Sequence, residues 1–489
     1  MTANAVSRRT FLQQQGLGAA ATLLLASGRA SAGPAQPPAA RPNVVVILAD
    51  DLGNADVGFQ GCRDIPTPHI DSIARNGVRF TNGYVSGPYC SPTRAGLMTG
   101  RYQQRFGHEF NEGTGRLPFG LPLTETTFAQ RMKDLGYATC GIGKWHLGNT
   151  PEFRPMRRGF DEYYGTLANT PFYHPNLLDS RVGPDPKRVE DPAFYATEAW
   201  ADRAVEFIGA NRSRPFFLYL PFNACHMPLQ APQKYIDRVG AIADENRRIY
   251  AAVMSAMDDA IGRVLATLRE AALEENTLVV FLSDNGGQRG VASDNLPLRG
   301  RKASTWDGGI RVPFAVQWKG HLPAGKTFEA PVIQLDLLPT AVAAAGGKVA
   351  ADWQLDGVNL LPHLTGQATG APHESLYWRF GPQWAIRQGD WKLVQGTIYP
   401  EDPKKPMPGG PPKARVHEPM LFTLAEDVGE QKDLAAQQPE RVKAMRAAYE
   451  SWNQQLAEPG WIPVQQPGKK KKAAAKAAAK KAAGEKKQE

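Results

Sequence analysis

Short runs of consecutive apolar residues recur along the chain, and each run ends in polar residues. The runs are NVVVILADD at 43–51, YATCGIGKWHLG at 137–148, RPFFLYLPFNACHMP at 214–228 and TLVVFLSDNGG at 277–287. Uninterrupted apolar runs of this length are typical of strands buried on both faces of a sheet. Between them lie amphipathic stretches such as 250–268, where apolar residues share one face of a helix. The alternation predicts an α/β domain over residues 43–365, with a mainly parallel or mixed sheet flanked by helices.

The polar ends of these runs carry the candidate chemistry. Ligands of such sheets bind beyond the carboxyl ends of the strands. Seven side chains fall there, from four separate segments: Asp50, Asp51, Lys144, His146, His226, Asp284 and Asn285. The four segments together predict one site at one edge of the sheet.

The pattern changes after about residue 365. The segments 374–380, 383–396 and 418–427 are typical of short antiparallel strands, and a helix is expected around 437–457. We therefore expect a smaller α+β domain with an antiparallel sheet over residues 366–462. The Pro/Gly/Lys stretch 400–414 is expected to be an exposed loop within it.

The net charge of +9 is concentrated at the two ends of the chain. Residues 469–489 hold nine Lys and two Glu, and the first 32 residues hold three Arg and no acid. The remainder is close to neutral, so the charge does not indicate nucleic-acid binding. No window approaches the roughly 18 consecutive apolar residues of a transmembrane segment. The tail 463–489 is expected to be disordered and solvated, with attachment to an anionic envelope or polysaccharide as the alternative.

The N-terminus is typical of an export signal. SRRTFLQ at 7–13 resembles the twin-arginine signature, and an apolar core (16–26) and the small residues Ala30-Ser31-Ala32 follow. We interpret residues 1–32 as a signal peptide for the twin-arginine export machinery and 33–42 as a linker; a short buried helix is the alternative. The implied location is periplasmic or extracellular.

The acids at the strand ends offer only oxygen ligands. Several carboxylates with an amide suit Ca²⁺ or Mg²⁺ better than zinc. Asp50 and Asp51 alone could instead cap a helix, but the second pair, Asp284 and Asn285, favours a metal site.

Four cationic or proton-donating side chains could bind an oxyanion, although each alone could be structural. Beside a divalent cation they would hold a tetrahedral oxyanion and stabilise charge on a leaving oxygen. They are Lys144, His146, His226 and Lys302.

Cys90, in NGYVSGPYCSPTRAGLMTGRY at 82–102, lies at the start of a predicted helix. A thiol there, near Arg94, could have a lowered pKa and act as a nucleophile. It could equally be an inert buried cysteine. A thiolate beside an oxygen-rich metal site is an unusual combination, because hard cations prefer oxygen.

Residues 90–94 read CSPTR and are followed by TGR at 99–101. The pattern resembles the C-x-P-x-R signature of the type I, formylglycine-dependent sulfatases. In that family a separate maturation enzyme oxidises the cysteine to an aldehyde, formylglycine. Other blocks match in family order over nearly the whole mature chain, including NVVVILADDLG, GKWHLG, LSDNGG and WDGGIRVP. The resemblance implies an alkaline phosphatase-like architecture and the hydrolysis of a sulfate ester, with a sulfated carbohydrate as the expected substrate.

The resemblance also implies the metal ligands and the nucleophile. Ca²⁺, rather than Mg²⁺, would be bound by Asp50, Asp51, Asp284, Asn285 and the modified residue 90. One hydroxyl of the hydrated aldehyde would attack sulfur, and the second would lose its proton to expel sulfate.

The remaining catalytic roles follow from the same resemblance. Arg94 and His146 would support the nucleophile, and Lys144 and Lys302 would hold the sulfate oxygens. His226 or Lys302 would help to protonate the leaving oxygen.

Other residues receive smaller or structural roles. His174, in a polar-aromatic loop at 169–181, is a candidate for substrate binding, with loop packing as the alternative. Asp258-Asp259 is expected on a solvated helix face. Cys62, Cys140 and Cys225 are compatible with one disulfide or none, and the oligomeric state is unknown.

Two rival functions remain open. One is a phosphonate monoester or phosphodiester hydrolase of the same superfamily. The other is a non-catalytic glycan-binding relative, which predicts losses among the candidate site residues.

Overall fold

The computed structural model describes residues 41–288, 290–399 and 413–463, which belong to one compact unit. The predicted signal peptide 1–32, nearly all of the linker 33–42, most of the loop 400–414 and all of the tail 463–489 except Pro463 lie outside these residues. Within the described ranges no helix is long and apolar enough to cross a membrane.

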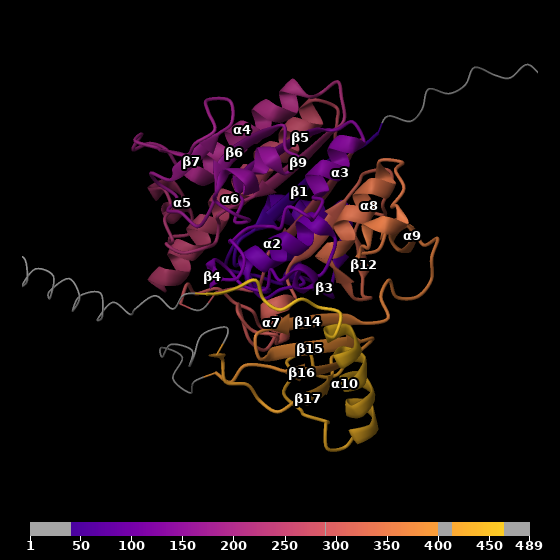
Figure 1. Ribbon diagram of the computed structural model, residues 1–489. Coiled ribbons are helices and arrows are strands. Elements are labelled where there is room, and N and C mark those ends of the chain that lie inside the picture. The colour runs from indigo at the N-terminus through magenta and orange to yellow at the C-terminus, as the bar shows by residue number, and fades with distance from the viewer. Residues whose placement is uncertain (1–40, 289, 400–412, 464–489) are drawn as a thin grey trace, which may run out of the picture. The chain divides into compact units, whose positions relative to one another are not determined.

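A ten-stranded mixed sheet forms the centre of this unit (Figure 1). The strands, in their order across the sheet, are β12 (Lys326–Phe328), β2 (Val78–Phe80), β11 (Phe314–Gln317), β10 (Thr277–Ser283), β1 (Asn43–Ala49), β9 (Phe216–Pro221), β5 (Ala138–Lys144), β6 (Glu162–Thr166), β7 (Asn176–Asp179) and β8 (Lys187–Arg188). The five strands from β10 to β6 are parallel, and β11, β7 and β8 each pair antiparallel with a neighbour. The predicted parallel or mixed sheet is confirmed.

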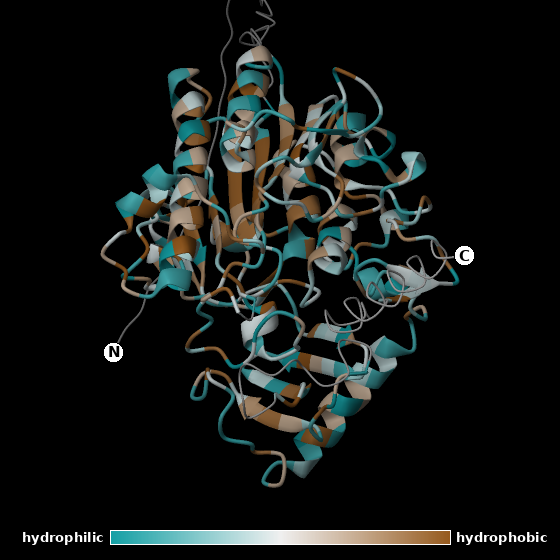
Figure 2. Ribbon diagram, turned by 90° about the vertical axis from the view of Figure 1, so that its left-hand side faces the viewer, coloured by the Kyte–Doolittle hydropathy of each residue, from teal (hydrophilic) through white to brown (hydrophobic). Residues whose placement is uncertain are grey.

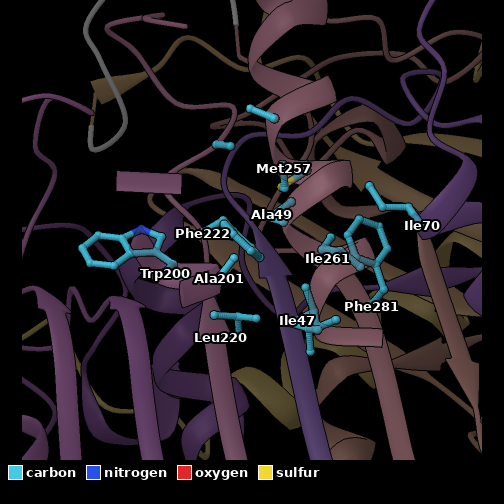
Figure 3. Close-up of a cluster of buried hydrophobic side chains, with 14 of the residues drawn as sticks. Ile47, Ala49, Ile70, Trp200, Ala201, Leu220, Phe222, Met257, Ile261 and Phe281 are labelled. Carbon is cyan, nitrogen blue, oxygen red and sulfur yellow. The ribbon is translucent and has the colours of Figure 1, made fainter. Parts of the chain in front are cut away.

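Both faces of the sheet are covered because its central strands are apolar on both sides. In β1, Val45 and Ile47 contribute to one core, whereas Val44 and Val46 contribute to the other. The first core includes α1 (Pro68–Arg75), α4 (Ala196–Ala210), α5 (Gln233–Arg238) and α6 (Glu245–Glu270). The second includes α2 (Cys90–Thr99), α3 (Phe128–Asp134), α8 (Leu337–Ala344) and α9 (Leu361–Leu364). Figure 3 shows the first core, with Ile47 and Phe281 of the sheet beside Ile261 of α6.

The distribution of hydrophobic and hydrophilic residues matches this layered arrangement of sheet and helices. The central strands are hydrophobic along their length in Figure 2, and the helices carry hydrophilic residues beside hydrophobic ones. This distribution is the pattern expected of amphipathic helices that cover a sheet buried on both faces.

The C-terminal part forms a separate four-stranded antiparallel sheet, as predicted. Its strands are β14 (Leu376–Phe380), β15 (Gln383–Gln388), β16 (Trp391–Gln395) and β17 (Met420–Thr423), and α10 (Pro439–Asn453) packs on it. Trp384 of β15 stacks on Tyr449 of α10 with ring centroids 4.4 Å apart. Other short elements include several 3-10 helices, α7 (Asp307–Ile310) and two strand pairs, β3 (Gly83–Tyr84) with β13 (Val332–Ile333) and β4 (Gly113–Gly115) with β18 (Trp461–Pro463).

The expectation of a solvated face at Asp258-Asp259 is wrong for Asp258. Its carboxylate is buried and accepts hydrogen bonds from the backbone N–H groups of His69 (3.1 Å) and Ile70 (2.8 Å), at the start of α1. Burial raises the pKa of Asp258 to about 7 despite these bonds. Asp259, by contrast, pairs with the exposed Arg238 at 2.8 Å. Helix α1 therefore receives its N-terminal acceptor from α6, a tertiary contact that a helical pattern does not reveal.

Candidate active site

Four adjacent parallel strands end at one edge of the sheet and bring the predicted residues together. Asp50 and Asp51 follow β1, and Asp284 and Asn285 follow β10. Lys144 is the last residue of β5, whereas His146 and His226 lie in the loops after β5 and β9. The strand order β10-β1-β9-β5 places these ends next to one another.

Oxygen atoms dominate the centre of the site. Ligand atoms of Asp50, Asp51, Cys90 and Asp284 all lie within 4.8 Å of one another, and all four residues are buried. The Nδ2 of Asn285 donates to Asp51 Oδ1 at 2.8 Å. The buried Oδ1 of Asn285 has no hydrogen-bond partner among the described residues. Three carboxylates and a free amide oxygen are donors that suit a hard cation such as Ca²⁺ or Mg²⁺, so the residues fit a metal of this class.

Three cationic side chains pair with these carboxylates. Lys144 Nζ lies 2.5 Å from Asp50 Oδ2, and Lys302 Nζ lies 2.7 Å from both Asp51 oxygens. Arg94 donates from Nε (3.0 Å) and Nη2 (2.7 Å) to Asp284 Oδ2. Such pairing is required because a buried unpaired charge is costly.

The charges shift the titration of the site in opposite directions. Burial alone would raise the pKa of Asp50, but Lys144, His226 and Arg94 hold it well below its usual range. Burial and the charge of Asp50 raise the pKa of Asp284 to about 7, against the effect of Arg94. Burial opposes the charge on Lys302, yet Asp51 raises the pKa of its ammonium. The Lys302 ammonium thus remains charged beside the oxygen cluster.

Cys90 begins α2, as the sequence predicts, and is fully buried. Its Sγ donates to Asp50 Oδ1 at 3.3 Å. Burial and the charge of Asp50 raise the pKa of this thiol well above its ordinary value. The interpretation of Cys90 as a nucleophilic thiolate of lowered pKa is therefore wrong, because burial and the Asp50 carboxylate outweigh the charges of Lys144 and Lys302.

The two predicted histidines differ in their surroundings. His146 is buried in a left-handed conformation (φ 61°), and its Nδ1 has no partner among the described residues. Burial, together with Lys144 and Arg94, holds its pKa well below the usual value. His226 is partly exposed, and its Nδ1–H donates to the carbonyl of Met227 at 2.6 Å. The Nε2 of His226 lies 3.7 Å from Asp51 Oδ2, so its free nitrogen faces the site.

His174 does not join this cluster. Its Nδ1 contacts the carbonyl of Val189 at 3.0 Å, and its backbone has a φ of 51°. No hydrogen bond or ion pair in the described part of the chain links it to the acidic centre. The cysteines Cys62, Cys140 and Cys225 are all free thiols.

Three contacts beside residue 90 involve residues that the sequence analysis did not select. The Ser91 hydroxyl lies 2.6 Å from His108 Nε2 and donates to the His146 carbonyl at 2.6 Å. The backbone N–H of Ser91 donates to Asn111 Oδ1 at 3.0 Å. The segment FGHEFNEG carries no periodic or motif signal for these roles, because they depend on how the loop is placed in the fold.

Comparison with known proteins agrees with this geometry. The family model described as Sulfatase matches residues 42–347. Arylsulfatase J of Mus musculus is 31% identical over 471 residues, which cover 88% of this chain and 78% of the relative. N-acetylgalactosamine-6-sulfatase of Sus scrofa is 30% identical, with 87% of each chain covered. The crystal structure of Ps i-CgsB in complex with k-i-k-neocarrahexaose is 34% identical, with a TM-score of 0.78 over 87% of this chain and 95% of that chain.

The family model matches more than half of the 489 residues, and the relatives are matched over most of their length. Together with the shared fold, these matches show that the chain belongs to the sulfatase family, enzymes that hydrolyse sulfate esters, within the alkaline phosphatase superfamily.

Proposed function

We propose that this protein is an exported sulfatase that hydrolyses a sulfate ester of a carbohydrate to the alcohol and inorganic sulfate. The observation that carries the proposal is the convergence of residue 90, the oxygen ligands and the cationic side chains at one sheet edge. Residues 43–365 would form the catalytic domain and residues 366–462 the smaller C-terminal domain.

The metal of this site would be Ca²⁺. Its ligands would be Asp50, Asp51, Asp284, Asn285 and the modified residue 90, and the partnerless Oδ1 of Asn285 supports this set. A bound Ca²⁺ supplies positive charge that lowers the energy of an anionic sulfate group and of an oxygen nucleophile.

Residue 90 would be formylglycine, made from Cys90 by a maturation enzyme. Hydrated formylglycine supplies two hydroxyl oxygens, one to attack sulfur and one to release sulfate afterwards. The raised pKa of the Cys90 thiol supports this proposal, because the unmodified side chain is a poor nucleophile. Arg94 would hold Asp284 in place through two hydrogen bonds, and His146 would support and activate the nucleophile.

Lysine and histidine side chains would bind the sulfate and protonate the leaving oxygen. Lys144 and Lys302 each bring an ammonium to the acidic centre, where they can hold sulfate oxygens. His226 presents its Nε2 toward the site and is partly exposed. Because its Nδ1–H is donated to the Met227 carbonyl, Nε2 would carry a proton only in the imidazolium form, and that proton would reach the leaving oxygen from the solvent side. Lys302 is the alternative proton donor.

Relatives support a carbohydrate substrate and motifs support export. The name of N-acetylgalactosamine-6-sulfatase includes a saccharide, and the crystal structure of Ps i-CgsB is described as a complex with k-i-k-neocarrahexaose. The twin-arginine motif at 7–13 supports export to the periplasm or beyond.

The first test is the mass of the tryptic peptide Phe80–Arg94, from protein made in a host that matures a control sulfatase. We expect the aldehyde at residue 90. Turnover of matched aryl sulfate, phosphate and phosphonate esters follows, with sulfate preferred. An unmodified thiol, or a preference for the phosphorus esters, contradicts the proposal; the latter result supports the phosphonate monoester or phosphodiester hydrolase.

A further inference from the structure

A chain of contacts connects the last described strand with the helix that carries residue 90. Trp461 of β18 is 1% exposed, and its indole N–H donates to the carbonyls of Phe110 (2.9 Å) and Asn111 (3.0 Å). The neighbouring backbone N–H of Gly460 donates to the carbonyl of Gly107 at 2.8 Å. Residues 107–111 are thus held by the C-terminal end of the described chain.

Two side chains of this loop contact Ser91, the residue after the proposed nucleophile. Asn111 Oδ1 accepts the backbone N–H of Ser91 at 3.0 Å, in the first turn of α2. His108 Nε2 lies 2.6 Å from the Ser91 hydroxyl oxygen. The His108 ring is fully buried and meets the Trp461 ring edge to face, with centroids 4.7 Å apart. Both contacts therefore depend on β18.

The Ser91 hydroxyl in turn fixes the backbone of His146. It donates to the His146 carbonyl at 2.6 Å. His146 has a positive φ of 61°, a conformation that costs a non-glycine residue on the order of 1 kcal/mol and requires support from its surroundings. The hydrogen bond from Ser91 provides such support at the residue itself.

Proton counting assigns the tautomer of His108. A hydroxyl has one proton, and that of Ser91 is donated to the His146 carbonyl, so Ser91 must accept a hydrogen bond from His108. His108 therefore carries its proton on Nε2. Burial lowers the pKa of His108 to about 3, with the Gly120 backbone opposing the shift, so the ring stays neutral at any pH used for an assay.

We propose that His108 is a positioning residue that acts through Ser91 on the backbone of His146 and on the first turn of α2, and that β18 holds His108 in place. The inference rests on the proposed function, because His146 and residue 90 are its reacting groups. No proton of the reaction passes through His108.

The test uses full-length protein with substitutions that change single hydrogen bonds. His108→Phe keeps a ring but removes the Nε2–H donor, whereas His108→Gln places an N–H near the same point. Trp461→Phe keeps the aromatic contact and removes the indole donor. The matched control is Trp318→Phe. The indole N–H of Trp318 has no hydrogen-bond partner among the described residues. Trp318 also follows Gln317, which pairs with β10 far from the carboxyl end of that strand.

We expect His108→Phe to lower kcat about tenfold with KM changed less than about twofold, because misplacement of reacting groups slows the chemical step. His108→Gln recovers most of kcat. Trp461→Phe lowers kcat in the same way, and its effect is not additive with that of His108→Phe, since both act through one contact chain. Trp318→Phe keeps the kcat of the original protein.

Two controls separate this inference from the proposed function. The mass of the Phe80–Arg94 peptide is measured in every variant. Each kcat is then calculated only for the fraction of protein in which residue 90 has been converted to formylglycine. Hydrogen–deuterium exchange over 88–94 and 145–149 reports positioning without any turnover, and we expect it to be faster in His108→Phe and Trp461→Phe. Unchanged kcat and exchange in His108→Phe, or equal loss of kcat and of Tm in His108→Phe and His108→Gln, overturn the inference. A converted but inactive original protein counts against the proposed function, while the exchange rates still decide the role of His108.

Discussion

Lys392 of β16 and Asp307 of α7 form a fully buried ion pair, with Nζ 2.7 Å from Oδ1. The same ammonium lies 2.8 Å from Oε1 of the buried Glu430. Burial raises the pKa of Glu430 to about 7, whereas Lys392 and Arg311 outweigh burial at Asp307 and lower its pKa to about 2. The ammonium of Lys392, in the C-terminal sheet, thus compensates the negative charge of Asp307, which follows Lys302 in the chain.

Replacement of Lys392 by Met should destabilise the protein strongly. It leaves Asp307 and Glu430 buried without their shared ammonium, and removal of one partner from a buried pair costs about 3–5 kcal/mol. Chemical denaturation measures the free energy of unfolding. The matched control is Lys432→Met, an exposed lysine, for which we expect a change within about 0.5 kcal/mol. A loss below about 1 kcal/mol in Lys392→Met would contradict the importance of the buried pair.

Calcium should stabilise the protein through Asp51. A ligand that binds only the native state adds about 2.7 kcal/mol to the free energy of unfolding when its concentration is about 100 times its dissociation constant. We therefore expect calcium to raise Tm and EDTA to lower it. Asp51→Asn should remove most of the calcium effect on Tm. Asn is a suitable replacement because Asp51 has a φ of 63°, which Asn tolerates.

The exposed Asp352→Asn is the control for calcium binding, and it should respond to calcium as the original protein does. Thermal unfolding with calcium, magnesium or EDTA distinguishes the expected calcium site from a magnesium site. An equal rise of Tm in Asp51→Asn and in the original protein would show that calcium binds elsewhere.

His226 should matter most for substrates whose leaving alcohol needs a proton. Loss of a general acid slows such reactions about 10²–10⁴-fold. We therefore expect His226→Ala to lower kcat by this range for a saccharide sulfate, and much less for an aryl sulfate with an acidic phenol. Exposed His321 supplies the control, His321→Ala, with kcat unchanged for both esters. Equal losses with the two leaving groups would assign the proton to Lys302 instead.

The sequence predicts those parts of the site that follow directly from strand ends. The ends of β1, β5, β9 and β10 are marked by apolar runs, and parallel pairing brings Asp50, Lys144 and Asp284 to one edge. The short strands of the C-terminal part follow from strand-forming segments bounded by turn residues, and the helix expected around 437–457 is α10.

Contacts between distant segments could not be predicted in this way. Trp461 reaches the carbonyl of Phe110 across 351 residues of sequence, so no local pattern marks His108 as its neighbour. The raised pKa of Cys90 likewise depends on its burial beside Asp50, whereas the sequence shows only Arg94 one turn away. The buried role of Asp258 also has no local signal, because the backbone donors that it binds belong to another helix.

Asp258 gives the clearest expected dependence of stability on pH. Its pKa is about 7 in the folded protein, where burial disfavours the ionised form, and about 3.9 in an unfolded chain. Between these pH values the native state holds a proton that the unfolded state has released. The contribution of Asp258 to the free energy of unfolding therefore falls as pH rises. This stabilising contribution is fully present below about pH 4 and lost above about pH 7.

Asp258→Asn imitates the protonated carboxyl group, since its amide oxygen can still accept from the N–H groups of His69 and Ile70. We therefore expect the stability of this variant relative to the original protein to rise by on the order of 2 kcal/mol from pH 5 to pH 8. Denaturation at both pH values measures the difference. Asp259→Asn is the matched control, because Asp259 is half-exposed and paired with Arg238, and its effect should be nearly the same at both pH values. A constant or falling difference for Asp258→Asn would mean that the carboxyl group is ionised throughout and stabilises α1 as a charged acceptor.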